Sequence, residues 1–127
     1  MTSDEAVNLT RAHFESQFPK VCGNCGVTFG SLRDFALQTS FQGHPISYDE
    51  ETGDAKPKNP LGIYSFANCA CGTTLAVTSD GMSSLMLWRI MTWVRKEARR
   101  RGRTWREVAA WIRGEIDRQA RSEAGSV

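Results

Sequence analysis

The four cysteines of the chain form two close pairs, and they are the residues whose types and spacing point most directly to chemistry. The first pair is Cys22 and Cys25, the second is Cys69 and Cys71, and 43 residues separate the pairs. Two sulfurs presented from each of two tight turns can surround a tetrahedral metal ion. The sequence therefore predicts a four-cysteine metal site, with zinc as the expected ion.

A glycine follows each pair, Gly26 after Cys25 and Gly72 after Cys71. Glycine at this position permits a left-handed backbone and lets amide N–H groups point at the sulfurs. These two turns resemble the zinc-ribbon and rubredoxin-like class of metal knuckles. The resemblance implies a four-cysteine site on a small β-containing scaffold. The second pair, Cys-x-Cys, is one residue shorter than the Cys-x-x-Cys usual in that class.

The same four thiols leave a second interpretation open. Tetrahedral sulfur ligation does not distinguish zinc from iron, so an iron or iron–sulfur centre is the alternative cofactor. A redox-sensing or electron-transfer protein, using a thiol switch or such a centre, is accordingly the alternative function. We interpret His13 and His44 as residues outside the site, because four cysteines already complete a tetrahedral shell.

The elements that must position the cysteines form an α+β pattern. Helices are expected where apolar residues recur at spacings of three and four, and strands where β-branched and aromatic residues cluster. Ser3 is the expected N-cap of the first helix, and either Asp80 or Ser83 caps a later one. The expected elements are helices over 4–18, 32–39, 82–101 and from the capping box at Thr104 to about 121, and strands over 27–29, 61–66 and 73–78. A strand over 35–41 competes with the second helix.

These elements divide into three expected parts: an N-terminal helix over 1–19, a metal-binding module over 20–79 and a basic helical hairpin over 80–127. Residues 42–60 are rich in proline and acidic residues, and we expect an exposed loop there. Tryptophan and methionine widen the apolar surface of the 82–101 helix. This breadth predicts packing against more than one neighbour and would also permit a homodimer.

Charge is unevenly distributed along the chain. Residues 1–88 hold five Lys/Arg against nine Asp/Glu, whereas residues 89–127 hold eleven against five. The basic residues concentrate where the last two helices join, and they are the candidate contacts for nucleic acid or an acidic partner: Arg95, Lys96, Arg99, Arg100, Arg101, Arg103 and Arg106. The alternatives are that this cluster faces the acidic half of the chain or only solvent.

The sequence contains no Gly-rich phosphate loop, no HExxH motif and no Ser/His/Asp arrangement, so we expect a non-enzymatic protein. The first residues lack the order of a signal peptide, and the most apolar run, 82–94, is shorter than a membrane span and contains Arg89. A cytoplasmic protein without membrane insertion is therefore expected. The combined prediction is a regulatory or adaptor protein in which zinc is structural and the basic hairpin contacts the partner.

Overall fold

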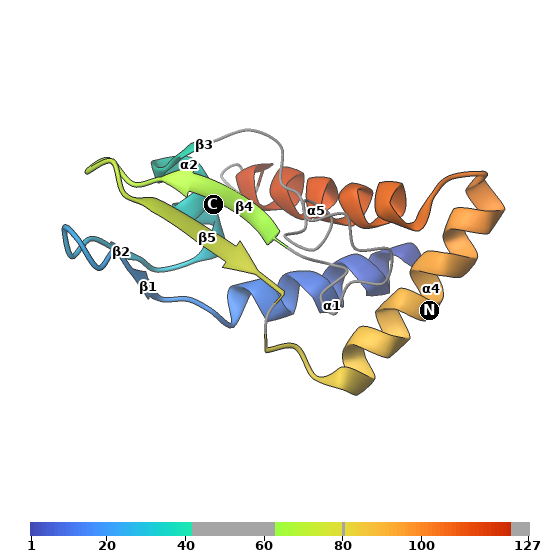
Figure 1. The fold of residues 1–127 in the computed structure, drawn as a ribbon. Coiled ribbons are helices and arrows are strands. Elements are labelled where there is room, and N and C mark those ends of the chain that lie inside the picture. Colours follow the sequence, from blue (N-terminus) through green and yellow to red (C-terminus); the bar gives the residue numbers. More distant parts are fainter. Residues whose placement is uncertain (42–62, 80, 123–127) are drawn as a thin grey trace.

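The computed structural model describes residues 1–41, 63–79 and 81–122 of the 127-residue chain, and it confirms the α+β fold class (Figure 1). The expected loop over 42–60 lies outside the described residues. The described elements are, in chain order, α1 (Ser3–Glu15), β1 (Lys20–Val21), β2 (Thr28–Phe29), α2 (Leu32–Gln38), β3 (Ser40–Phe41), β4 (Ile63–Asn68), β5 (Thr74–Thr78), α4 (Ser84–Arg101) and α5 (Trp105–Ser122).

The starts of the two C-terminal helices follow from side-chain caps. At α5 the predicted capping box forms: the Glu107 N–H donates to Thr104 Oγ1, and the Thr104 N–H donates to the Glu107 carboxylate, both at 3.2 Å. Ser83 caps α4 by accepting from the Met86 N–H. The other candidate for that cap, Asp80, lies outside the described residues.

The N-cap predicted for α1 was wrong by one residue. The cap is Thr2, whose hydroxyl accepts from the Glu5 N–H, so Ser3 is already the first helical residue. Threonine can serve this role because, like serine, it places an oxygen near the free amides of the first turn.

The predicted helix over 32–39 forms as α2. Ser31 caps it by accepting from the Asp34 N–H at 3.1 Å. The competing strand over 35–41 was wrong except for its last two residues, which form β3.

The strands form two small antiparallel sheets. In the first, β1 pairs with β2, with Lys20 opposite Phe29. In the second, β4 is the central strand between β3 and β5, with Phe66 opposite Ala76. The predicted hairpin of 61–66 and 73–78 is thus present with slightly shifted bounds. Each sheet has a cysteine pair in the turn that joins two of its strands.

The helices and sheets share one apolar core. Helix α5 contacts α1, α2 and α4, so it is the element around which the others pack. Phe29 and Phe35 lie edge to face with ring centroids 5.5 Å apart. The cysteines Cys22 and Cys69 belong to the same cluster, which joins the two cysteine turns to the C-terminal helices. The fully buried large side chains are Phe14, Phe29, Leu32, Phe35, Val77, Ile90, Val94, Val108, Ile112 and Ile116.

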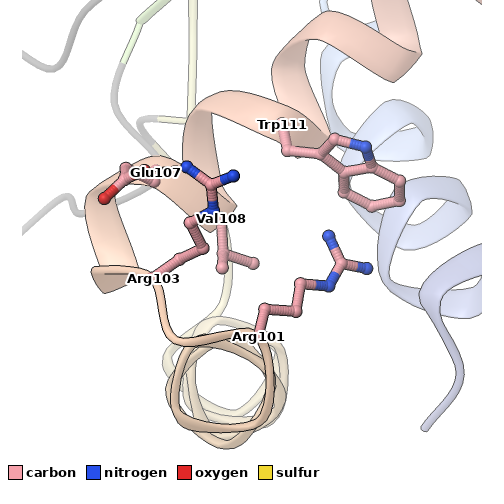
Figure 2. Close-up of a pocket in the computed structure, with 5 residues that line it drawn as sticks. All are labelled: Arg101, Arg103, Glu107, Val108 and Trp111. Atoms are coloured by element: carbon pink, nitrogen blue, oxygen red, sulfur yellow. Dashed lines mark hydrogen bonds and ion pairs between the residues drawn. The ribbon is translucent and has the colours of Figure 1, made fainter.

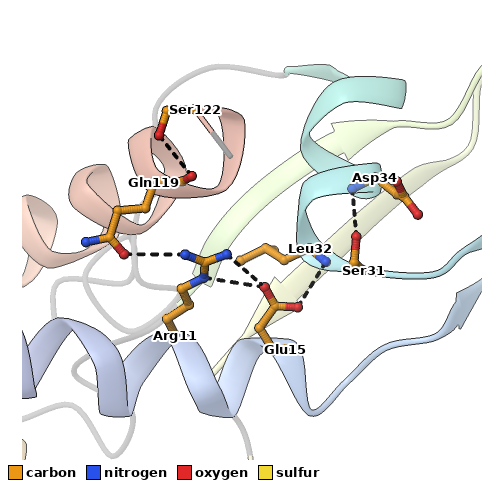
Figure 3. A network of polar contacts seen from close by, with 7 residues as sticks. All are labelled: Arg11, Glu15, Ser31, Leu32, Asp34, Gln119 and Ser122. Carbon is orange, nitrogen blue, oxygen red and sulfur yellow. Dashed lines mark hydrogen bonds and ion pairs between the residues drawn. The ribbon is translucent and has the colours of Figure 1, made fainter. Parts of the chain in front are cut away.

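A chain of polar contacts also ties α1 to its neighbours (Figure 3). The Glu15 carboxylate accepts from the Leu32 N–H at the start of α2 and from the Arg11 guanidinium. Arg11 in turn donates to Gln119 Oε1 on α5 at 3.5 Å. These contacts connect α1 to the start of α2 and to α5.

The cysteine turns and the α4–α5 joint lie at opposite ends of the described structure (Figure 1). Within the described residues, no helix has both the length and the apolar composition that a bilayer span requires.

Candidate metal centre and basic helix face

The first cysteine turn connects β1 to β2. The Cys22 N–H donates to the Val27 carbonyl and the Gly26 N–H donates to the Cys22 carbonyl, both at 2.9 Å. Gly26 has φ +80°, the left-handed conformation predicted for it. This conformation costs a residue with a Cβ about 1–2 kcal/mol, so glycine lets the turn close without strain.

The second turn connects β4 to β5 and repeats this pattern with one residue fewer. The Cys69 N–H donates to the Thr73 carbonyl at 2.9 Å, and the Gly72 N–H donates to the Cys69 carbonyl at 2.8 Å. Gly72 has φ +94°. The Cys-x-Cys pair therefore forms a tighter turn that still presents both sulfurs to one side.

The two turns bring all four predicted ligands together. Every pair of the sulfur atoms of Cys22, Cys25, Cys69 and Cys71 lies within 4.8 Å. Two short separations join one turn to the other: 3.5 Å from Cys25 Sγ to Cys69 Sγ and 3.7 Å from Cys22 Sγ to Cys71 Sγ. Four sulfurs about 2.3 Å from a tetrahedral zinc ion are separated by about 3.8 Å. The arrangement could therefore hold one metal ion with little rearrangement.

Burial divides the four ligands into two types. Cys22 and Cys69, the first cysteine of each pair, are buried in the core, whereas Cys25 and Cys71 are exposed. A metal held here would be anchored to the core on one side and open to solvent on the other. His13 lies on α1 against Phe14 and is not part of the cluster, and His44 lies outside the described residues.

Hydrogen bonds from the turns favour the thiolate forms of two of the ligands. The hydroxyl of Thr73 and the side-chain amide of Asn24, at 3.3 and 3.5 Å from the sulfur, lower the pKa of Cys71 to about 5. The backbone N–H groups of Cys25 and Asn24 lower the pKa of Cys22. The expected amide-to-sulfur contacts are thus present.

The thiol of Cys25 behaves in the opposite way. The Val27 N–H favours its thiolate, but the neighbouring sulfur of Cys69, desolvation, and the sulfurs of Cys71 and Cys22 together outweigh that contact and raise the pKa of Cys25 to about 11. Sulfurs this close repel one another when all are ionised. A cation at the centre of the cluster would remove this repulsion, so metal binding should release the Cys25 proton.

Asn24 and Thr73 are residues that the sequence interpretation missed. Asn24 lies in the first turn but donates to a sulfur of the second, so it bridges the two turns. A polar side chain inside a Cys-x-x-Cys turn is the only signal that could have pointed to it, because the partner is 47 residues away in the chain.

Substitution of Gly26 by alanine is expected to weaken metal binding. The added Cβ strains the left-handed residue by about 1–2 kcal/mol, which corresponds to an apparent metal affinity about 5- to 30-fold lower. Gly23→Ala is the matched control in the same turn, because Gly23 has no positive φ and a Cβ added there would meet no described atom within 4 Å. Competition with a chelator measures both variants, and equal affinities would contradict a knuckle-type turn.

The seven basic residues predicted to contact a partner divide into two groups. Those near the helix joint are engaged within the protein: Arg100 and Arg101 pair with Glu97, and Arg103 pairs with Glu107. Arg106 stacks over Trp105, 4.7 Å from the ring centroid. The Arg100 pairing lowers the pKa of the Glu97 carboxyl, with a smaller contribution from Arg101.

Arg101 is held on two sides. It donates to Glu97 at 2.9 Å, and its guanidinium lies 4.7 Å from the centroid of Trp111. In Figure 2 the guanidinium lies beside the indole, and both side chains line a pocket of about 520 Å³ together with Arg103, Glu107 and Val108. This cation–π contact connects α4 to α5. Arg101 thus stabilises the joint.

The second group faces solvent on α4. Arg95, Lys96 and Arg99 are exposed, and they make no hydrogen bond or ion pair with any residue of 1–41, 63–79 or 81–122. Arg89, which the sequence interpretation did not include, has the same character. Trp88 lies beside these residues and is 64% exposed. The sequence did not predict that Trp88 is exposed, because apolar residues are spread over nearly the whole surface of this helix.

Comparison of the chain with protein-family models, with characterised proteins and with solved structures gives no match.

Proposed function

We propose that this protein is a non-enzymatic adaptor in which a structural zinc ion holds the two cysteine turns and helix α4 contacts a polyanionic partner, either nucleic acid or an acidic protein. The observation that carries the proposal is the group of four exposed cations on one face of α4 that have no ion-pair partner among the described residues. Such guanidinium and ammonium groups can bind phosphates or carboxylates without first breaking an ion pair with any described residue.

We propose zinc as the ion, because the donor set fits a structural zinc site. Four thiolates form a closed shell with no position left for substrate, as in structural zinc sites of the zinc-ribbon type. The Asn24 amide donates to Cys71 Sγ, and the Thr73 hydroxyl, which accepts from the Cys71 thiol, can donate to the same sulfur once it is a thiolate. Both contacts would stabilise the thiolate charge around the ion. Metal analysis with an absorption spectrum separates the two candidate metals, because zinc is colourless and iron–thiolate centres absorb visible light.

Loss of the α4 cations is expected to remove salt-dependent binding. Each phosphate contact contributes a slope of about 0.7–0.9 in a plot of log affinity against log salt, so Arg95→Ala/Lys96→Ala/Arg99→Ala should reduce the slope by about two to three. The matched control is Arg103→Ala/Arg118→Ala/Arg121→Ala, which removes the same charge from residues paired with acids. Fluorescence anisotropy with labelled DNA, RNA and polyglutamate at two salt concentrations measures both. Absence of salt-dependent binding to all three probes would refute the contact function.

The exposure of Cys25 and Cys71 favours one second candidate function, a redox sensor. The sulfurs of Cys25 and Cys69 are 3.5 Å apart and lie in different turns, so their oxidation by a peroxide would join the turns by a disulfide and expel the metal. Mild peroxide tests this candidate. Retention of the metal and of four free thiols would exclude it.

A further inference from the structure

The solvent face of α4 combines an exposed aromatic ring with these four cations. Leu85 and Trp88 are 68% and 64% exposed, whereas Met91 and Trp93 of the same helix are buried in the core. The only acid of α4, Glu97, is buried and paired with two arginines near the end of the helix. At about 100° per residue, one sector of roughly 120° of the helix surface holds Trp88, Arg89, Arg95, Lys96 and Arg99. This face therefore offers an aromatic platform in a positive field.

A groove runs beside this platform. It has a volume of about 330 Å³ and is lined by Met1, Trp88, Arg89, Thr92, Trp93 and Lys96. The volume is at the lower end of the range for small-ligand sites, so the groove can hold one planar group. Its walls provide two indoles, and Arg89 and Lys96 place positive charge beside them. A flat aromatic group that carries negative charge at one edge matches these walls.

The cations continue along the helix beyond the groove. Trp88 and Arg99 are eleven residues apart, which corresponds to about 16 Å along the axis. At the spacing of about 3.4 Å between stacked nucleotides, this length covers about five. The face is thus long enough for a short stretch of a nucleic-acid strand, with its first base at Trp88.

We infer that this face binds single-stranded nucleic acid, with one base stacked on Trp88 in the groove and the backbone phosphates paired with Lys96, Arg95 and Arg99. The inference deepens the proposed function and rests on it. A base can stack on a side chain only when it is not stacked between neighbouring bases, and single strands permit this. In a duplex the faces of the bases are covered by the adjacent base pairs. An acidic protein could use the cations and pack an apolar side chain on the indole, but cations that flank the groove on the same face match a polymer that carries phosphates next to flat bases.

Substitution of Trp88 tests the inference. Base–aromatic stacking contributes about 1–3 kcal/mol per base, so Trp88→Ala should weaken binding of a single-stranded oligonucleotide about 5- to 150-fold. Trp88→Phe should retain most of the affinity because it keeps an aromatic face. Leu85→Ala is the matched control, since Leu85 is equally exposed one turn earlier but does not line the groove. Thermal melts of each variant check that the fold is intact, and parallel DNA and RNA probes show which sugar is preferred.

The outcomes separate the inference from the function on which it rests. Equal affinities of wild type and Trp88→Ala for single strands, or tighter binding of a duplex of the same length, would overturn stacking while leaving the polyanion-binding function intact. Binding of polyglutamate without binding of either nucleic acid would also overturn the inference and identify an acidic protein as the partner class. Absence of binding to every probe would refute both proposals.

Discussion

Removal of the metal is expected to unfold the two cysteine turns and the strands that they join. Strands β1 and β2 have two residues each, and too few backbone hydrogen bonds connect them to hold the first turn alone. Structural zinc contributes on the order of 10 kcal/mol in peptide models, whereas a small domain is stable by only about 5–15 kcal/mol in total. Because Cys22 and Cys69 are part of the common core, we expect this loss to weaken the helices as well.

Hydrogen exchange with and without a chelator measures this effect directly. Protection should disappear first in 20–29 and 68–78, and the cooperative thermal transition should broaden or vanish. Cys22→Ser and Cys71→Ser should reproduce the result in the presence of metal. Ala70→Ser is the matched control, because it places the same hydroxymethyl group between two ligands without removing a sulfur. A chelated protein with unchanged protection and melting temperature would show that the cysteines do not hold a structural ion.

Replacement of Ile112 by alanine is expected to destabilise the whole described fold by about 2–5 kcal/mol. Ile112 is fully buried on α5, the helix that contacts α1, α2 and α4, and its truncation leaves a cavity that these elements cannot fill without moving. For a chain of this size the melting temperature should fall by on the order of 10 °C. Leu85→Ala removes the same number of carbons from an exposed site and should change stability by no more than about 0.5 kcal/mol.

The Ile112→Ala variant is measured as metal-loaded protein with two probes, hydrogen-exchange protection in the cysteine turns and circular dichroism of the helices. Cysteine-turn protection and helical circular dichroism should be lost together in Ile112→Ala, since one core joins the turns to the hairpin. Two separate transitions, one for the turns and one for the helices, would instead support 20–79 and 80–127 as independently folding parts.

Much of this fold could be predicted because its local signals agree with one another. The capping box at Thr104 marked the start of α5, and the spacing of apolar residues gave the helix faces that are buried. The cysteine turns were predictable for a similar reason, because glycine after each pair has a conformational role that few other residues can fill. Predictions failed at positions where neighbouring residues offered equivalent chemistry, as at Thr2 and Ser3.

Some of the contacts that engage the basic residues depend on tertiary packing, which the sequence alone does not reveal. Glu97 lies three and four residues before Arg100 and Arg101, so their pairing could have been predicted from helical spacing. The stacking of Arg101 on Trp111 could not, because it requires the position of α5 relative to α4. The same holds for Trp88 and Trp93, which have the same side chain five positions apart, one facing solvent and the other the core.

The separation of the cysteine turns from the basic face has a thermodynamic consequence (Figure 1). The two sites share no residue. Under the proposed function each ligand binds the folded chain in preference to the unfolded one, so each reduces the population of unfolded protein from which the other would be released. Linkage makes this effect reciprocal. In a weakened variant such as Ile112→Ala, a bound polyanion should therefore slow the escape of zinc from an end of the molecule that it does not touch.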